Sequence, residues 1–167
     1  IRWASDRIKD QGVIGFVTNA GWLDAGTTDG MRKCLLEEFS SLYIFHLRGN
    51  QRTSGEKSRQ EGGKIFGSGS RSPIAISILV KNSKSEQQGK IYFHDIGDYL
   101  SREEKLEKIS AFNSVKGIEN VNGWQIITPD EHGDWLNHRD NTFEKYISIG
   151  EKKSDETISL FKDYSLG

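Results

Sequence analysis

One stretch of the chain combines many charges with many glycines, and it constrains the fold more than any other. Between Leu47 and Arg71 there are six glycines and six Lys or Arg residues against two acids. Such a stretch is not expected in a core, because its charges would need partners and its glycines lose backbone entropy on ordering. The flanking runs 42–47 and 74–80 are apolar, β-branched and aromatic. We therefore expect two antiparallel core strands, joined at one end, that hold out a long, flexible, cationic loop without a clear helix.

The segments before this loop predict an alternation of helices and strands. Residues 1–10 carry apolar residues on one helical face, and residues 13–18 form a short apolar run next to glycine, typical of a strand covered on both faces. A second helix is expected to begin near residues 27–29, with Arg32 on its solvent face. Alternating helices and strands indicate an α/β sheet.

Further elements are expected after the second core strand. Residues 90–94 predict another strand, and residues 121–127 could add one more. Ser101 and Glu104 have the spacing of a capping box, which predicts a helix from there to about Asn113.

Composition excludes several classes of protein. The chain of 167 residues is the size of one domain, and its net charge of −1 does not by itself indicate a nucleic-acid binder. No apolar run approaches the roughly 20 residues that span a bilayer, so we expect no membrane partner. The single cysteine, Cys34, fits a reducing cytoplasm. His132 and His138 are better explained as surface histidines than as metal ligands, so no metal site is predicted.

Catalytic motifs are also missing. The chain has no GxSxG nucleophile elbow and no phosphate-binding loop. The run 66–69 mimics the Phe-x-Gly-x-Gly turn that binds S-adenosylmethionine, but a charged segment precedes it instead of an apolar strand. Pro73 and Pro129 are far apart, so the Asn/Asp/Ser-Pro-Pro-Tyr loop of amino-methyltransferases is absent. We predict no catalytic residues, and the chain alone is not expected to methylate a base.

Several short motifs nevertheless resemble a known family, the Type ISP restriction-modification enzymes. These are large polypeptides that join a nuclease, a DNA translocase of the helicase superfamily, an adenine-N6 DNA methyltransferase and a target-recognition domain. The segments that resemble the methyltransferase region are Gly12–Asn19, Asp29–Gly30, Leu47–Asn50, Arg52–Thr53, Gly55–Glu56, Glu61–Gly63, Ile65–Gly67 and Gly69–Arg71. The later segment Pro129–Asp140 also resembles that family.

The resemblance implies a place within such a polypeptide. The fold class would be α/β, a fragment of a Rossmann-like S-adenosylmethionine-dependent methyltransferase sheet. Strands five and six would be 13–18 and 42–47, and 74–80 would be the antiparallel strand seven. Residues 1–118 would form the C-terminal half of that domain, and residues 119–167 the connection toward the target-recognition domain. The cofactor turn and the proline loop would lie outside this chain, which agrees with a first helix that has neither a start methionine nor a cap.

The expected partners are DNA and the remainder of the parent polypeptide, and the expected location is the cytoplasm. S-adenosylmethionine would be the parent enzyme's cofactor, with none bound by the fragment. Cationic and polar side chains of the loop are predicted to contact DNA phosphates. Asn19 and Asp24 are candidates to line a pocket at the sheet edge. The DNA-contact candidates are Arg48, Asn50, Arg52, Lys57, Arg59, Lys64 and Arg71.

Two alternatives stay open on the sequence. The loop could be a solvated linker, and the chain could be a non-catalytic nucleic-acid-binding or assembly module. Related adenine methyltransferases place an aromatic residue near strand seven to stack on the extruded adenine, whereas Val80 occupies the aligned position here. Trp22 and Trp135 are more easily explained as core or interface residues than as base-stacking platforms.

Overall fold

The computed structural model describes residues 1–67, 70–138, 142, 145–147, 149–150 and 160–161. The chain divides into two compact units, Ile1–Asn137 and His138–Gly167. In the second unit, the backbone N–H of Phe161 donates a hydrogen bond to the carbonyl oxygen of Ile149 at 2.9 Å. The division predicted between residues 118 and 119 stays a prediction, although residues 119–137 belong to the same unit as the sheet.

The first unit is built on a five-stranded sheet of order β1-β3-β2-β4-β5. β3 is antiparallel to both β1 and β2, β2 is parallel to β4, and β4 is antiparallel to β5. The antiparallel pairing predicted for the two core strands is therefore confirmed. The strands are β1 (Gln11–Asn19), β2 (Ser41–Arg48), β3 (Ile74–Asn82), β4 (Lys90–Asp95) and β5 (Gln125–Ile127).

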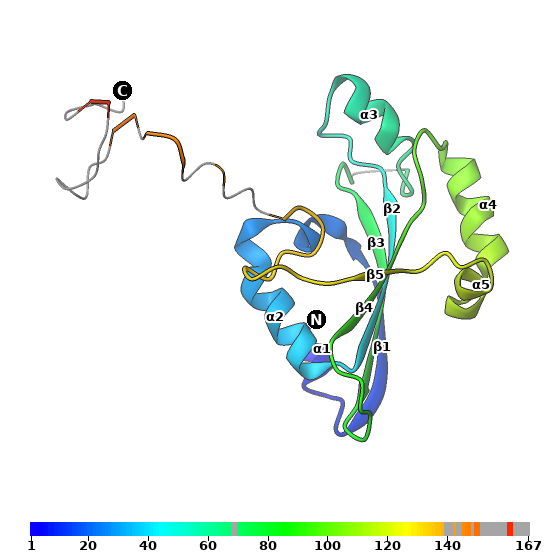
Figure 1. The fold of residues 1–167 in the computed structure, drawn as a ribbon. Coiled ribbons are helices and arrows are strands. Elements are labelled where there is room, and N and C mark those ends of the chain that lie inside the picture. The colour runs from blue at the N-terminus through cyan, green and yellow to red at the C-terminus, as the bar shows by residue number, and fades with distance from the viewer. Residues whose placement is uncertain (68–69, 139–141, 143–144, 148, 151–159, 162–167) are drawn as a thin grey trace. The chain divides into compact units, whose positions relative to one another are not determined.

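Helices lie on both sides of this sheet, with α1 and α2 on one side and α4 and α5 on the other (Figure 1). α3 lies beyond one end of the strands, in the connection from β2 to β3. The capping box predicted for α4 is present, because the Ser101 hydroxyl accepts from the N–H of Glu104 and the Glu104 carboxylate accepts from the N–H of Ser101. The helices are α1 (Arg2–Ser5), α2 (Asp29–Glu38), α3 (Gly55–Glu61), α4 (Arg102–Phe112) and α5 (Val115–Asn120), with 3-10 turns η1 (Ala20–Leu23) and η2 (Gly26–Thr28).

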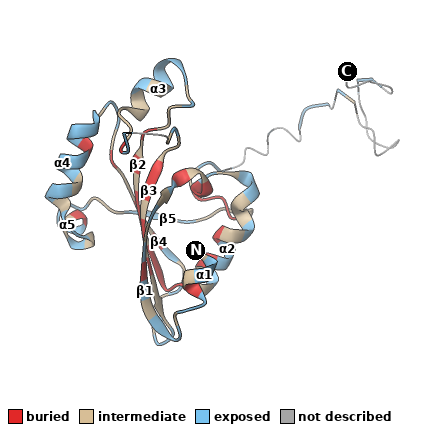
Figure 2. Cartoon of the chain, turned by 180° about the vertical axis from the view of Figure 1, so that it is seen from behind, coloured by how far each residue is buried: buried red, intermediate tan, exposed pale blue. Residues whose placement is uncertain are grey.

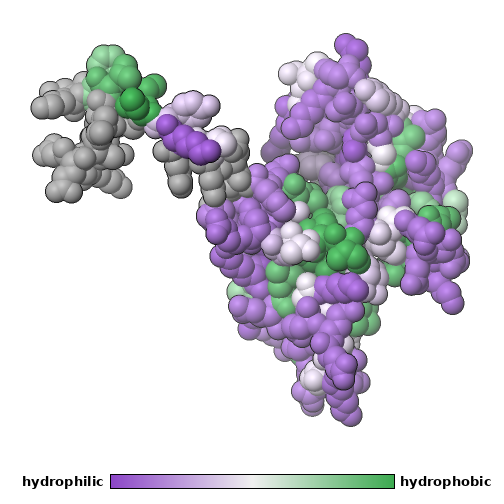
Figure 3. Space-filling model, viewed as in Figure 1, coloured by the Kyte–Doolittle hydropathy of each residue, from purple (hydrophilic) through white to green (hydrophobic). Residues whose placement is uncertain are grey.

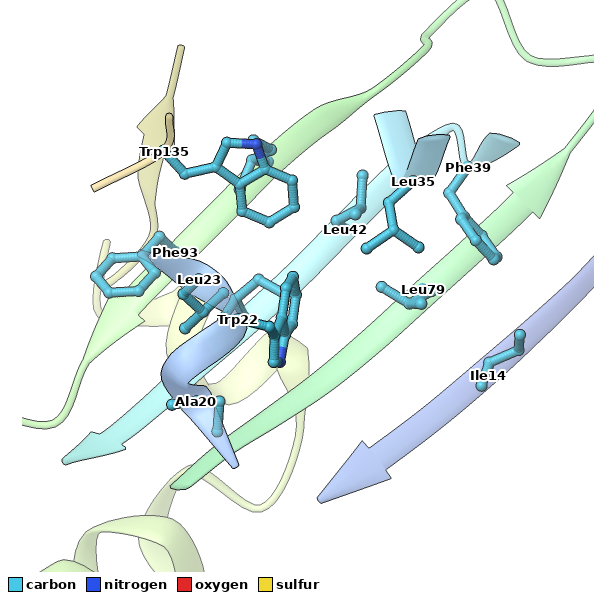
Figure 4. Close-up of a cluster of buried hydrophobic side chains, with 13 residues drawn as sticks. Ile14, Ala20, Trp22, Leu23, Leu35, Phe39, Leu42, Leu79, Phe93 and Trp135 are labelled. Carbon is cyan, nitrogen blue, oxygen red and sulfur yellow. The ribbon is translucent and has the colours of Figure 1, made fainter. Parts of the chain in front are cut away.

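Two apolar clusters hold the helices on the sheet, and buried residues follow the strands and the inner faces of the helices (Figure 2). In the first cluster, Leu35 of α2 and Phe39, which directly follows α2, pack over Leu42 and Leu79 of the sheet (Figure 4). Trp22 and Trp135 also belong to it, with ring centroids 5.5 Å apart in an edge-to-face arrangement, so they are core residues. The second cluster, under α4 and α5, consists of Phe45, Leu47, Ile65, Ile74, Ile96 and Ile118.

Two expectations about the first half of the chain are wrong. β1 is not covered on both faces: Val13 is 66% exposed and Val17 is 56% exposed, because no described helix covers that face of the sheet over β1. The first helix is also shorter than residues 1–10, since α1 ends at Ser5.

Arg32 is a larger correction, because its side chain is fully buried instead of facing solvent. Its guanidinium donates to Asp134 Oδ1 at 2.6 Å and to the carbonyl oxygen of Gly133 at 3.0 Å. It also donates to the carbonyl oxygens of Trp22 and Ala25. The turn that contains Asp134 covers the polar face of α2, so a residue 102 positions away decides the environment of Arg32.

Candidate nucleic-acid interface

The described residues of the connection from Gly49 to Pro73, which are 49–67 and 70–73, are folded, in contrast to the flexible loop expected from its composition. It contains α3, and its Ile65 is buried in the second apolar cluster. The Arg102 side chain donates to the carbonyl oxygen of Ile65 at 2.9 Å. The glycines and charges of this segment are therefore accommodated by tertiary hydrogen bonds that its own sequence does not reveal.

The two ends of the α3 excursion meet at a point that we call the neck, formed by residues 49–51 and 61–63. The N–H of Gly49 donates to the carbonyl oxygen of Glu61 at 3.1 Å, and the N–H of Asn50 donates to the Glu61 carboxylate at 2.9 Å. The Gln51 amide donates to the carbonyl oxygen of Gly62 at 3.2 Å. The neck closes the excursion into a compact lobe.

The neck rests directly on the chain that enters α4. The N–H of Gly63 donates to the carbonyl oxygen of Leu100 at 2.8 Å. A Cβ atom on Gly62 or on Gly63 would lie well inside 3.0 Å of the backbone of Leu100 or Arg102, respectively, and Gly62 also has φ +65°. These two glycines are required by close backbone approach, since any side chain would separate the neck from α4.

The predicted DNA-contact residues of this connection differ in their surroundings. Arg52 and Lys57 are exposed and Lys64 is half-buried, and none of the three has an ion pair within the described residues. Arg59 is exposed and pairs with Glu56 at 3.1 Å, and the exposed Arg71 donates to the carbonyl oxygen of Gln51. Hydrophilic residues cover the end of the molecule where α3 lies (Figure 3).

The side chains of Arg48 and Asn50 already bind other groups of the protein. Arg48 Nε donates to Asp95 Oδ1 at 2.7 Å, and its Nη1 pairs with Asp98. The Asn50 side chain accepts from the N–H of Arg52 at 3.0 Å. Within the described residues, Arg52, Lys57, Lys64 and Arg71 therefore carry positive charge that no carboxylate pairs with, and the side chains of the first three have no hydrogen-bond partner there.

Asp95 is the centre of the polar network around Arg48. Burial alone would raise the pKa of Asp95, but hydrogen bonds with His46, with the Gly97 N–H and with Arg48 lower this pKa to about 2. Asp95 is therefore ionised at neutral pH and holds Arg48 against the carboxyl end of β4. The backbone of Arg48 has φ 56°, which directs the chain away from the sheet and into the neck.

A polar groove of about 330 Å³ lies at the carboxyl ends of the parallel strands β2 and β4. It brings together Asp24 and two of the predicted DNA-contact residues, Arg48 and Lys57. Asn19 does not line this groove; its side chain accepts from the N–H of Gly21 and caps η1. The groove is lined by Asp24, His46, Arg48, Lys57, Gln60, Glu61, Phe93, Asp95, Leu136 and Asn137.

Sequence reasoning missed three groups at this end of the molecule. His46 and Asp95 are partners in the ladder of the parallel strands β2 and β4, near the carboxyl ends of both, which was a usable signal once β4 had been paired with β2. Lys105 is fully buried, and nothing in the polar sequence of α4 distinguishes it from its neighbours. Phe66 is an aromatic side chain of the connection that is 48% exposed.

Within the described residues, no group of three or more His, Cys, Asp or Glu side chains is arranged to hold a metal ion. No helix of the described part of the chain is long and apolar enough to cross a membrane.

Comparison with known proteins places these features in a wider context. No protein-family model and no curated protein matches the chain. Among solved structures, it is similar to a nuclease-deletion mutant of the Type ISP restriction-modification enzyme LlaGI in complex with a DNA substrate mimic. The identity is 51%, the TM-score is 0.81, and the match covers 91% of this chain and 12% of that chain.

Two further structures match over nearly the whole chain. The ATP-dependent Type ISP restriction-modification enzyme LlaBIII bound to DNA is 43% identical, with a TM-score of 0.85 and coverage of 98% of this chain and 10% of that chain. A DrdV–DNA complex studied by cryo-electron microscopy is 32% identical, with a TM-score of 0.82 and coverage of 99% and 16%.

The class defined by these likenesses is that of restriction-modification enzymes. More narrowly, the chain is similar to one segment of the Type ISP enzymes, so the resemblance inferred from its short motifs is confirmed. The chain spans 12% and 10% of the lengths of the two Type ISP chains that it matches.

Proposed function

We propose that this chain is a DNA-contacting part of the methyltransferase region of a Type ISP restriction-modification enzyme acting in the cytoplasm. The observation that carries the proposal is its 51% and 43% identity, over 91% and 98% of its length, to segments of Type ISP enzymes in complexes with a DNA substrate mimic and with DNA. The enzyme as a whole would transfer a methyl group from S-adenosylmethionine to adenine N6. The remainder of the polypeptide would supply the cofactor turn and the catalytic loop.

The sheet geometry supports this assignment. β1 and β2 run in the same direction, and β3 lies between them and antiparallel to both. This arrangement fits strands five, six and antiparallel seven of a methyltransferase sheet. β4 and β5 extend the sheet beyond β2.

The distribution of charge supports DNA contact by the lobe. Arg52, Lys57 and Lys64 lie within 13 positions of one another in the connection that the neck closes. Cations without protein partners release counterions from DNA when they bind phosphates, and this release provides affinity without reading sequence. Arg48, which Asp95 and Asp98 already neutralise, would position the lobe instead of contacting phosphate.

The proposal is tested by removing two of these cations from the full-length polypeptide that carries this sequence. We expect R52A/K64A to weaken DNA binding and to reduce the slope of log affinity against log salt by about two, roughly one for each lost phosphate contact. The matched control is K9A/K84A, which removes the same charge from exposed lysines at the opposite end of the sheet. An unchanged salt slope in R52A/K64A would contradict the assignment of the interface.

The catalytic part of the proposal needs a separate measurement. Incubation of the full-length polypeptide with S-adenosylmethionine and DNA, followed by nucleoside analysis, should give N6-methyladenine. DNA binding without any methyl transfer would favour the alternative of a non-catalytic binding or assembly module.

A further inference from the structure

Lys105 connects α4 to the lobe that carries the unpaired cations. Its side chain is fully buried, and its ammonium donates to the carbonyl oxygens of Glu61 at 2.7 Å and Gly63 at 2.8 Å. Both acceptors belong to the neck. The Glu61 carbonyl also accepts from the N–H of Gly49, so one oxygen joins both sides of the neck to α4.

The position of these hydrogen bonds decides where the cations lie. Gly63 directly precedes Lys64, and Glu61 is the last residue of α3, which carries Lys57. Asn50, held by the Glu61 carboxylate, in turn accepts from the N–H of Arg52. Arg52, Lys57 and Lys64 therefore each lie within four residues of a neck group that is hydrogen-bonded to Lys105 or belongs to Glu61.

The role of the ammonium is not simply to fill space. A methionine would occupy the same volume without the cost of desolvating a charge, so the specific contribution of Lys105 is its hydrogen bonding to the neck. We propose that Lys105 is a positioning residue for DNA binding: its ammonium fixes the neck, and through it the places of Arg52, Lys57 and Lys64. This inference rests on the proposed DNA-contacting function.

The protonation of Lys105 changes within a pH range in which DNA binding can be measured. The pKa of Lys105 is lowered to about 8, chiefly by burial; the charge of Glu61 opposes this shift, that of Arg48 adds to it, and that of Asp95 opposes it. Other charged groups near this site are Asp98, which pairs with Arg48, and Arg102, Glu104 and Lys108 on α4. His46 hydrogen-bonds to Asp95 on the neighbouring strand.

The sign of the pH effect follows from the geometry. Below about pH 8 the ammonium is charged and can donate to both carbonyls of the neck, whereas above it the amine loses one donor and its charge. If the closed neck is the form that binds DNA, binding must be coupled to proton uptake by Lys105 at high pH. The affinity of the wild-type protein should then fall as the pH rises through about 8.

The experiment measures DNA affinity by fluorescence anisotropy at fixed ionic strength, using the full-length polypeptide and a labelled duplex, between about pH 7 and about pH 9.5. For K105M we expect affinity about tenfold weaker than wild type at about pH 7 and no fall through pH 8. K105R should bind at about pH 7 and should also lose the fall, because a guanidinium stays charged throughout this range. K108M is the matched control, since Lys108 donates to Ile96 outside the neck, and it should retain the wild-type profile.

The possible results separate the inference from the function on which it rests. A wild-type protein that does not bind DNA overturns both. DNA binding by wild type with no fall through about pH 8, or with the same fall in K105R, overturns the role of Lys105 and leaves the function standing. The pH profiles of wild type and K105R remain decisive even if K105M fails to fold.

Discussion

The buried pair of Arg32 and Asp134 gives the sharpest prediction about stability. We expect Arg32→Met to destabilise the 167-residue chain by about 3–5 kcal/mol, because it leaves the Asp134 carboxylate, only 7% exposed, without its guanidinium. The carbonyl oxygens of Trp22, Ala25 and Gly133 would lose a charged donor at the same time. A loss of this size is a large part of the roughly 5–15 kcal/mol that stabilises a typical domain.

The assay is urea unfolding at about pH 7, followed by tryptophan fluorescence and near-ultraviolet circular dichroism. Trp22 and Trp135 pack together next to Arg32, so both signals report on this part of the core. With a slope of about 2 kcal/mol per M, the midpoint of Arg32→Met should fall by about 2 M urea. Lys33→Met, at the exposed neighbouring position of α2, should change stability by no more than about 0.5 kcal/mol.

A double variant tests the physical reason. Arg32→Met combined with Asp134→Asn should be more stable than Arg32→Met alone, because the amide leaves no buried charge to compensate. The reasoning is refuted if Arg32→Met costs less than about 1 kcal/mol, or if the double variant is no more stable than the single one.

Three further predictions concern the site and its support. Burial would raise the pKa of Asp95, but its hydrogen bonds lower this pKa to about 2. Asp95 should therefore add about 1–2 kcal/mol to the free energy of unfolding above about pH 4, and this contribution should be lost as the pH falls toward 2. Acid titration of unfolding in wild type and Asp95→Asn measures the contribution, and identical pH profiles would count against it. Gly62→Ala should lower the free energy of unfolding in urea by more than about 2 kcal/mol, because its Cβ would overlap the Leu100 carbonyl and its φ is positive. Gly30→Ala, with open space at its Cβ, should be nearly neutral, and equal effects of the two variants would contradict the close approach. Ser101→Ala should cost about 1 kcal/mol by removing the α4 cap, again by urea unfolding, with Ser110→Ala on the exposed part of the same helix as the control.

The sequence predicted those elements whose signals are local. The runs 42–47 and 74–80 are rich in β-branched and aromatic residues, and they pair antiparallel as expected. Ser101 and Glu104 indicated the start of α4, because a capping box provides hydrogen bonds to backbone N–H groups within a single turn. Likewise, the cationic character of the connection is a property of composition alone.

The features that escaped prediction depend on partners far away in the chain. Arg32 had the helical spacing of a solvent-facing residue, but the distant Gly133 and Asp134 bind its guanidinium in a buried position. The apolar residues of β1 suggested burial, although an apolar strand at a sheet edge can keep one face exposed. The glycine-rich connection suggested flexibility, whereas Gly62 and Gly63 permit contact with a helix about 40 positions later.

The position of β3 between β1 and β2 has a consequence for how this chain acquires its structure. β1 ends at Asn19 and β2 at Arg48, but the strand that hydrogen-bonds to both does not begin until Ile74. During synthesis, both earlier strands therefore leave the ribosome before their shared neighbour exists. Such distant pairings impose a large loop-closure cost and slow the search for the native topology, so nascent chains ending before residue 74 should depend on chaperones more than longer ones.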